Sequence, residues 1–174
     1  MTSSQIPAWI DRRFNFEFPA TLYLNLIARI RGAPPRLEDA VVGLSHEQLI
    51  ETRDGKWSIQ ENAGHLLDEE DLFERRLRAY LEGAQTLPPA PYANVKLTHN
   101  DRDIHNILLE FRAAREQQVQ QLLRLRPEDF GRSAWHARLK VEMRLVDHLV
   151  FVAEHDDHHL ARIWELRSAI TNFD

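Results

Sequence analysis

The sequence contains no cysteine among its 174 residues. Disulfide bonds, thiolate metal ligands and a cysteine nucleophile are therefore excluded. Disulfides are rare in compartments that keep thiols reduced, so the absence of cysteine agrees with a cytoplasmic protein, and we expect that location.

Long apolar runs and blocks of basic residues are also missing. No apolar stretch approaches the roughly 18 residues of a membrane span, and no basic segment followed by an apolar one opens the chain, so we expect neither membrane insertion nor secretion. The formal net charge is −5 with both signs interspersed, so no nucleic-acid surface is indicated. A Gly-rich phosphate loop is absent too, which leaves no evident nucleotide cofactor.

The few glycines and prolines divide the chain into amphipathic segments. We expect an irregular lead over residues 1–18 that packs on the rest of the chain, and a short helical segment at 36–44. The apolar periodicity predicts four longer helices, over residues 19–31, 58–83, 101–125 and 139–170. Four such helices predict one all-α domain spanning residues 1–174, a four-helix bundle, and bundle cores commonly house metal sites.

The connection between the second and third long helices is unusually long. It holds 17 residues, Ala84 to Asn100, with three prolines and no sustained period. An extended chain of that length reaches more than about 50 Å, which exceeds the length of the second helix. The connection can therefore cross the bundle, and we expect the second and third helices to run parallel.

The last helix carries three histidines in its apolar stripe. At 100° per residue, His148, His155 and His159 fall within about 80° of arc together with leucine, valine and isoleucine positions. His155 and His159 are four residues apart, so both imidazoles can turn toward one point beside the helix. Buried imidazoles leave several ring nitrogens to satisfy without water, which favours a metal ion over two hydrogen-bonded core histidines.

The polar neighbours of this pair are weaker candidates. His158 lies about 100° from His159 on the helical wheel and is expected at the rim of the site. Asp156 and Asp157 flank the stripe, so we expect them to support the ligands or to face solvent. His148 lies about 10 Å before His155 along the axis, too far for shared coordination but suitable for a pocket wall.

A third ligand is available on the second long helix. Ser58 and Glu61 form a capping-box pattern that sets the start of this helix. His65 shares a face with the large apolar residues of the same helix, so it is a buried histidine facing the bundle core. The alternative is a core histidine that is satisfied by a hydrogen bond. His99 and His105 are weaker candidates, and His46 is expected at the surface.

Three stretches resemble the DinB/YfiT-like metalloenzymes, a four-helix-bundle superfamily. They are Trp57-Ser58-Ile59-Gln60-Glu61-Asn62 followed by Gly64-His65-Leu66, then Trp135-His136 with residues 141–149, and His155-Asp156-Asp157-His158-His159-Leu160. The resemblance covers residues 18–168. It departs at His136-Ala137 and Lys140, where many relatives have His-Pro and a glycine, and this difference bears on the shape of that loop.

The resemblance implies a site and a class of chemistry. In this family three histidines hold a divalent metal, usually nickel or zinc, and they correspond to His65, His155 and His159. The better-understood members transfer low-molecular-weight thiols to electrophiles, and relatives include a mycothiol-dependent isomerase and amide hydrolases. The middle helices of the bundle are parallel in the family, and relatives are often dimers, so the resemblance implies a homodimer.

The leading hypothesis is therefore a metal-dependent transferase or hydrolase acting on a small-molecule substrate. Three histidines leave a coordination position open, which is typical of catalytic sites. Glu69 and Arg76 lie on the His65 face of the second helix and are the candidate catalytic residues, one to shuttle a proton and the other to hold an anionic substrate. For both, the alternative is an ion pair on the rim of the bundle.

Two further function classes share features of this sequence pattern. A metal- or ligand-binding stress-response protein without turnover would have the same sequence pattern, so it stays open as the alternative. A ferritin-like dimetal bundle needs glutamates on two helices and Glu-x-x-His on two others, and only an approximate Asp156-x-x-His159 is present. The zinc-peptidase motif His-Glu-x-x-His is absent because Asp156 replaces its glutamate.

Overall fold

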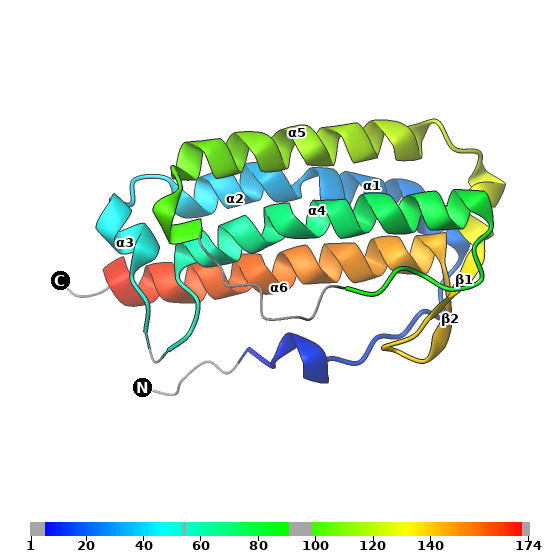
Figure 1. Ribbon diagram of the computed structural model, residues 1–174, viewed down its shortest axis with the longest axis horizontal. Coiled ribbons are helices and arrows are strands. Elements are labelled where there is room, and N and C mark those ends of the chain that lie inside the picture. Colours follow the sequence, from blue (N-terminus) through cyan, green and yellow to red (C-terminus); the bar gives the residue numbers. More distant parts are fainter. Residues whose placement is uncertain (1–5, 54, 91–98, 172–174) are drawn as a thin grey trace.

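The computed structural model describes residues 6–53, 55–90 and 99–171 and shows an all-α four-helix bundle (Figure 1). This confirms the predicted fold class. The helices are α1 Tyr23–Arg31, α2 Ala33–Val41, α3 His46–Ile50, α4 Ile59–Glu82, α5 Ile104–Leu123 and α6 Leu145–Thr171. Short 3₁₀ turns lie at Trp9–Asp11, Ala20–Leu22, His99–Asp101 and Pro127–Gly131, and two strands at β1 Ser133–His136 and β2 Val141–Arg144.

The four members of the bundle are the consecutive pair α1–α2, then α4, α5 and α6. Figure 1 shows α4 and α5 running in the same direction, while α1–α2 and α6 run the opposite way. The two middle helices are thus parallel. Residues 91–98 of the connection between them lie outside the described residues, so its course across the bundle stays a prediction.

The helix that carries His65 begins and ends where the sequence predicts. The Ser58 hydroxyl accepts from the Glu61 amide at 3.0 Å, and the Glu61 carboxylate accepts from the Ser58 amide at 2.8 Å. This reciprocal pair satisfies two of the free amides at the start of α4. At the other end, Gly83 adopts a left-handed conformation with φ 73°, which ends the helix at little steric cost.

Several predicted boundaries are wrong. The helix α1 begins at Tyr23 instead of Pro19, after a 3₁₀ turn at Ala20–Leu22, and α5 begins at Ile104 instead of Asp101, because Asp103 caps it. The short helix begins at Ala33 instead of Arg36, because Pro34 and Pro35 sit in its first turn, where no amide hydrogen is needed. The last helix begins at Leu145 instead of Leu139, because residues 133–144 form an antiparallel hairpin with His136 opposite Val141. Its strands of four residues are too short to show a clear alternation in the sequence.

The N-terminal lead packs on the bundle, as predicted. Trp9, Phe14, Phe16 and Phe18 all pack against the buried apolar cluster that includes Phe151 of α6. The rings of Trp9 and Phe151 meet edge to face with centroids 5.0 Å apart. This segment therefore covers the face of α6 on which the histidines lie.

A buried ion-paired group, here called the Arg115 cluster, joins all four members of the bundle. Arg115 of α5 donates from Nη1 to Asp156 of α6 at 2.6 Å and to the Ile30 carbonyl of α1 at 2.8 Å. Its Nη2 donates to Glu70 of α4 at 2.5 Å. Gln118 also donates to the Glu70 carbonyl, at 2.7 Å. No pattern in the sequence predicts this cluster, because arginine is mostly exposed in proteins and a single arginine on a helix is therefore expected at the surface.

Gly64 lets the 3₁₀ turn at His99–Asp101 lie directly against α4. A Cβ at position 64 would lie 2.1 Å from Cγ of His99, whose Nε2 is hydrogen-bonded to Asp68 at 2.8 Å. Glycine to alanine inside a helix usually stabilises by about 0.5–1 kcal/mol. Here we expect Gly64→Ala to lower the free energy of unfolding by about 1–3 kcal/mol, as overpacking does, in urea denaturation.

The matched control is the same substitution in a His99→Ala background, where the obstructing ring is gone. There Gly64→Ala should become neutral or stabilising. Equal destabilisation in both backgrounds would mean that the contact with His99 is not the reason for the glycine.

Candidate metal centre

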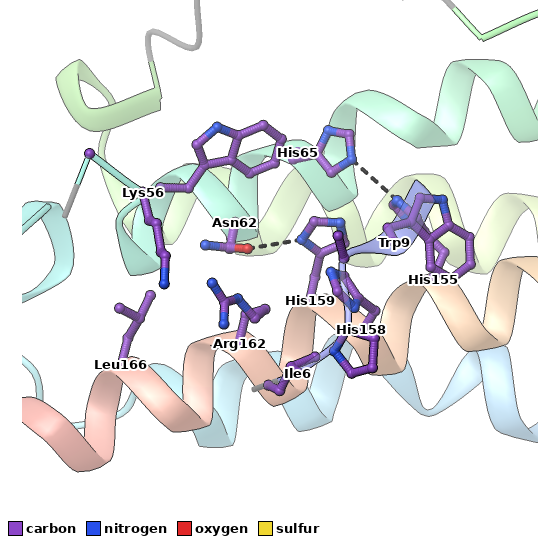
Figure 2. A pocket seen from close by; sticks show the side chains of 14 residues that line it. Ile6, Trp9, Lys56, Asn62, His65, His155, His158, His159, Arg162 and Leu166 are labelled. Atoms are coloured by element: carbon purple, nitrogen blue, oxygen red, sulfur yellow. Dashed lines mark hydrogen bonds between the residues drawn. The ribbon is translucent and has the colours of Figure 1, made fainter. Parts of the chain in front are cut away.

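Three histidines from two helices meet at one point of the bundle. His65 comes from α4, and His155 and His159 come from successive turns of α6. Nε2 of His65 lies 3.2 Å from Nε2 of His155, and one nitrogen of each of the three rings lies within 4.8 Å of the other two (Figure 2). These are the three residues that the sequence places together.

The donor set fits a divalent ion. Two nitrogens bound to one tetrahedral zinc at about 2.0–2.1 Å would lie about 3.3 Å apart, close to the separation of the His65 and His155 nitrogens. Burial lowers the pKa of His65 to about 4 and lowers the pKa values of His155 and His159 well below their ordinary range. All three imidazoles are therefore neutral at pH 7, the form that binds a metal.

Asn62 fixes the orientation of His159. The Nδ1 of His159 lies 2.9 Å from Oδ1 of Asn62. The side-chain nitrogen Nδ2 of Asn62 donates to the Ser58 carbonyl at 2.8 Å. Because Asn62 Oδ1 only accepts, Nδ1 of His159 carries the proton and its Nε2 keeps a free lone pair for a metal. The sequence places Asn62 on the His65 face, but nothing there predicts this role.

An open pocket of about 880 Å³ lies in front of the three histidines. Trp57 contacts two of them, edge to face with His65 at 4.9 Å and stacked on His159 at 5.9 Å between centroids. Trp9 meets His155 edge to face at 5.0 Å. Arg162 and the half-buried His158 also line the pocket, so His158 lies at its rim (Figure 2).

Glu69 and Arg76 line a second cavity, which shares Trp9, His65 and His155 with the open pocket. This cavity, here called the rear chamber, has a volume of about 170 Å³. Arg76 is buried and donates from Nε to the Pro88 carbonyl at 3.0 Å. Burial raises the pKa of Glu69, an effect that Arg76 partly offsets.

The structure separates the remaining candidates from the three-histidine site. His46 and His105 are exposed, and His99 is buried against α4 with Asp68 as its partner. Asp156 belongs to the Arg115 cluster, and Asp157 is ion-paired with arginines of α1 and α2. His148 is buried among Phe73, Tyr80 and Phe151, and it lines a small cavity that Glu69 and His155 also line.

The fold and the three histidines define a four-helix-bundle protein with a candidate metal site on facing helices, a common arrangement in bundles. The sequence pattern of the DinB superfamily matches residues 29–163, and the chain belongs to that superfamily. No curated protein matches the sequence.

Among solved structures, the chain is similar to YfiT from Bacillus subtilis, described as a probable metal-dependent hydrolase with an unusual four-helix bundle topology. The two share 22% sequence identity over 94% of this chain and 95% of that one, with a TM-score of 0.80. At this identity the similarity shows the fold. Within the described ranges, every helix is too short or too polar to cross a membrane.

The cap of α4 is connected to the site, because the Ser58 carbonyl holds Asn62, which in turn holds His159. We expect Ser58→Ala to lower the free energy of unfolding by about 1 kcal/mol, the usual cost of a lost cap. We also expect it to weaken metal binding. Urea denaturation with and without chelator measures both effects.

Ser45→Ala is the matched control for this prediction. Ser45 caps α3 in the same reciprocal way with Gln48, but it makes no contact with the histidines. It should leave metal affinity unchanged and cost less stability than Ser58→Ala, because Ser45 is exposed whereas Ser58 is buried and its hydroxyl also donates to Asn100 at 2.7 Å. If Ser58→Ala also left metal affinity unchanged, the cap and the site would be independent.

Proposed function

We propose that His65, His155 and His159 bind one divalent ion, zinc or nickel, and that the protein is a metal-dependent transferase or hydrolase acting on a small electrophile. The observation that carries the proposal is the convergence of three neutral imidazole nitrogens beside an open pocket. The description of YfiT as a probable metal-dependent hydrolase supports it. We also expect a homodimer, as the family resemblance implies.

The nucleophile in this proposal is water or a thiol from solution. A divalent ion at such a site lowers the pKa of a water or thiol and thereby supplies the nucleophile. The chain has no cysteine, so no protein thiol can form a covalent intermediate. Asn62 keeps His159 in the required tautomer, and Trp57 and Trp9 keep the imidazoles in place through ring contacts.

Glu69 and Arg76 are the proposed catalytic pair. Burial raises the pKa of the Glu69 carboxyl, which favours its role as a group that takes and returns a proton. Arg76, which is buried in the same rear chamber, would hold an anionic part of the substrate. An ion pair on the rim is the alternative for both residues, and the burial of Arg76 argues against it.

The test is an activity screen with the metal-loaded protein. A panel of low-molecular-weight thiols with a chlorinated arene probes thiol transfer, and an activated ester without thiol probes hydrolysis. We expect a rate that chelator abolishes and that rises with pH through one ionisation before levelling off. Glu69→Gln should lower this rate by about 100-fold, the usual contribution of a general base.

Two outcomes would contradict the proposal. A rate that survives both metal removal and His159→Ala would mean that the histidines are not the catalyst. Metal binding with no turnover on any member of the panel would favour the alternative, a non-catalytic metal- or ligand-binding stress-response protein.

A further inference from the structure

The tip of the β1–β2 hairpin brings two hydrogen-bond donors to the rear chamber. His136 is the last residue of β1, and Arg138 lies in the four-residue loop that follows. Both line the chamber together with Arg76, Glu69 and Phe151. The hairpin is therefore part of the cavity wall, next to the proposed metal ligands.

The ring of His136 is held in one tautomer. Its Nδ1 accepts from the backbone amide of Leu139 at 3.2 Å, so in the neutral ring Nε2 carries the hydrogen. Burial, with nearby Arg76 and Arg138, lowers the pKa of His136 to about 4, so the ring is neutral at pH 7. His136 is only 2% exposed, and its Nε2–H has no acceptor among the described residues.

Arg138 also has a buried hydrogen-bond donor without an acceptor, and this donor carries a full positive charge. Its guanidinium lies over the Phe151 ring, 5.5 Å from the centroid, and its Nη2 is buried without an acceptor in the described part of the chain. A buried donor without an acceptor is costly, and most costly when it is charged. A ligand with several hydrogen-bond acceptors, bound between His136 and Arg138, would satisfy both donors.

The charges of the chamber indicate a monoanion. Arg76 and Arg138 contribute two positive charges, Glu69 contributes one negative charge when ionised, and His136 is neutral. One net positive charge remains when no ion is bound to His65 and His155, which also line the chamber. The floor is apolar, since Phe151, Leu72 and Trp9 line it, so it suits the carbon skeleton of an organic acid.

We propose that His136 and Arg138 form a carboxylate subsite in the rear chamber, so that the substrate is a small organic monocarboxylate whose other end faces His65 and His155. Only the claim that this carboxylate is the substrate rests on the proposed function. The binding of a carboxylate by His136 and Arg138 does not depend on it. Carboxylate oxygens accept from both the imidazole Nε2–H and the guanidinium. In this arrangement His136 and Arg138 are specificity residues that fix the substrate's orientation.

Calorimetric binding of butyrate to the full chain tests the subsite separately from metal chemistry. The titration is done with metal-loaded and with chelator-treated protein, and butyramide and inorganic phosphate serve as comparison ligands. We expect butyrate to bind both protein forms. Butyramide should bind both at least about tenfold more weakly, because a charged hydrogen bond is lost, and phosphate should bind the chelator-treated form at least about tenfold more weakly, because its higher charge is mismatched.

Variants of Arg138 and His136 test whether butyrate binds to the hairpin. Arg138→Gln should weaken butyrate binding at least about tenfold and Arg138→Lys less, while Arg112→Gln, which removes the same charge on the exposed face of α5, should have no effect. His136→Gln, which keeps a donor, should retain more affinity than His136→Phe. Circular dichroism checks that each variant is folded.

Four results would overturn the subsite. The first three are equal affinity for butyrate and butyramide, tighter binding of phosphate than of butyrate to the chelator-treated protein, and an Arg138→Gln variant that binds butyrate as the parent does. Loss of butyrate binding on chelation alone would mean that the carboxylate binds the ion and not the hairpin. A protein that binds butyrate through Arg138 but shows no turnover would keep the subsite and remove the enzymatic function.

Discussion

His159→Ala is expected to abolish stoichiometric binding of a divalent ion. His159 contributes one of three converging nitrogens, and Asn62 holds its ring in the metal-binding tautomer. Loss of a residue that merely supports a ligand typically costs about 10–100-fold in metal affinity, so loss of a ligand should cost at least about 100-fold. Metal analysis after dialysis, and zinc or nickel titration of the chelator-treated protein, measure the effect.

His158→Ala is the matched control, because it removes a neighbouring imidazole that lines the same pocket and contacts the His159 ring but contributes no nitrogen to the three-histidine cluster. It should keep one ion per chain. His155→Ala should behave like His159→Ala, since both nitrogens belong to the cluster. An undiminished stoichiometry in either of these two variants would mean that the ion binds elsewhere.

Helical periodicity was sufficient to find the three histidines. An apolar stripe that contains histidine identifies a buried imidazole, and a spacing of four residues brings two imidazoles to one side of α6. His65 follows by the same reasoning on α4, and the capping box fixes where that helix starts. These are local rules, so they act within one helix and need no knowledge of the fold.

What the sequence does not reveal are contacts between distant segments. Asn62 gains its role only when α6 lies beside α4, and His136 and Arg138 reach the rear chamber only because residues 133–144 form a hairpin instead of a helical turn. Arg115 is a further case. Its burial depends on Glu70 and Asp156, which are 45 and 41 residues away along the chain. Pairing of this kind leaves no periodic signal.

Arg115→Met should strongly destabilise the fold. The guanidinium is 2% exposed, and its removal leaves the carboxylates of Glu70 and Asp156 buried without a counter-ion and the Ile30 carbonyl without a donor. Breaking a buried pair in this way typically costs about 3–5 kcal/mol. Urea denaturation of the chelator-treated protein measures the cost without a contribution from metal binding.

Arg112→Met is the surface control on the same helix. Its ion pair with Glu38 is half-exposed on both sides, so its loss should cost less than about 1 kcal/mol. A triple variant, Arg115→Met with Glu70→Leu and Asp156→Leu, should recover much of the lost stability, because replacing a whole buried ionic group by apolar side chains is often neutral. A triple variant no more stable than Arg115→Met would show that the guanidinium acts through packing and not through charge.

The pH dependence gives a second readout of the same cluster. Burial raises the pKa of Glu70 from 4.5 to about 7 even though Arg115 opposes the shift. Between these values the folded protein binds more protons than the unfolded chain, so this group's contribution to stability falls as the pH rises. Without Arg115 the pKa should rise further, so the deficit of Arg115→Met should be smaller near pH 5, begin to grow near pH 7 and reach its full size only above the raised pKa of the variant. A deficit that is constant across this range would mean that the buried carboxylates do not carry the effect.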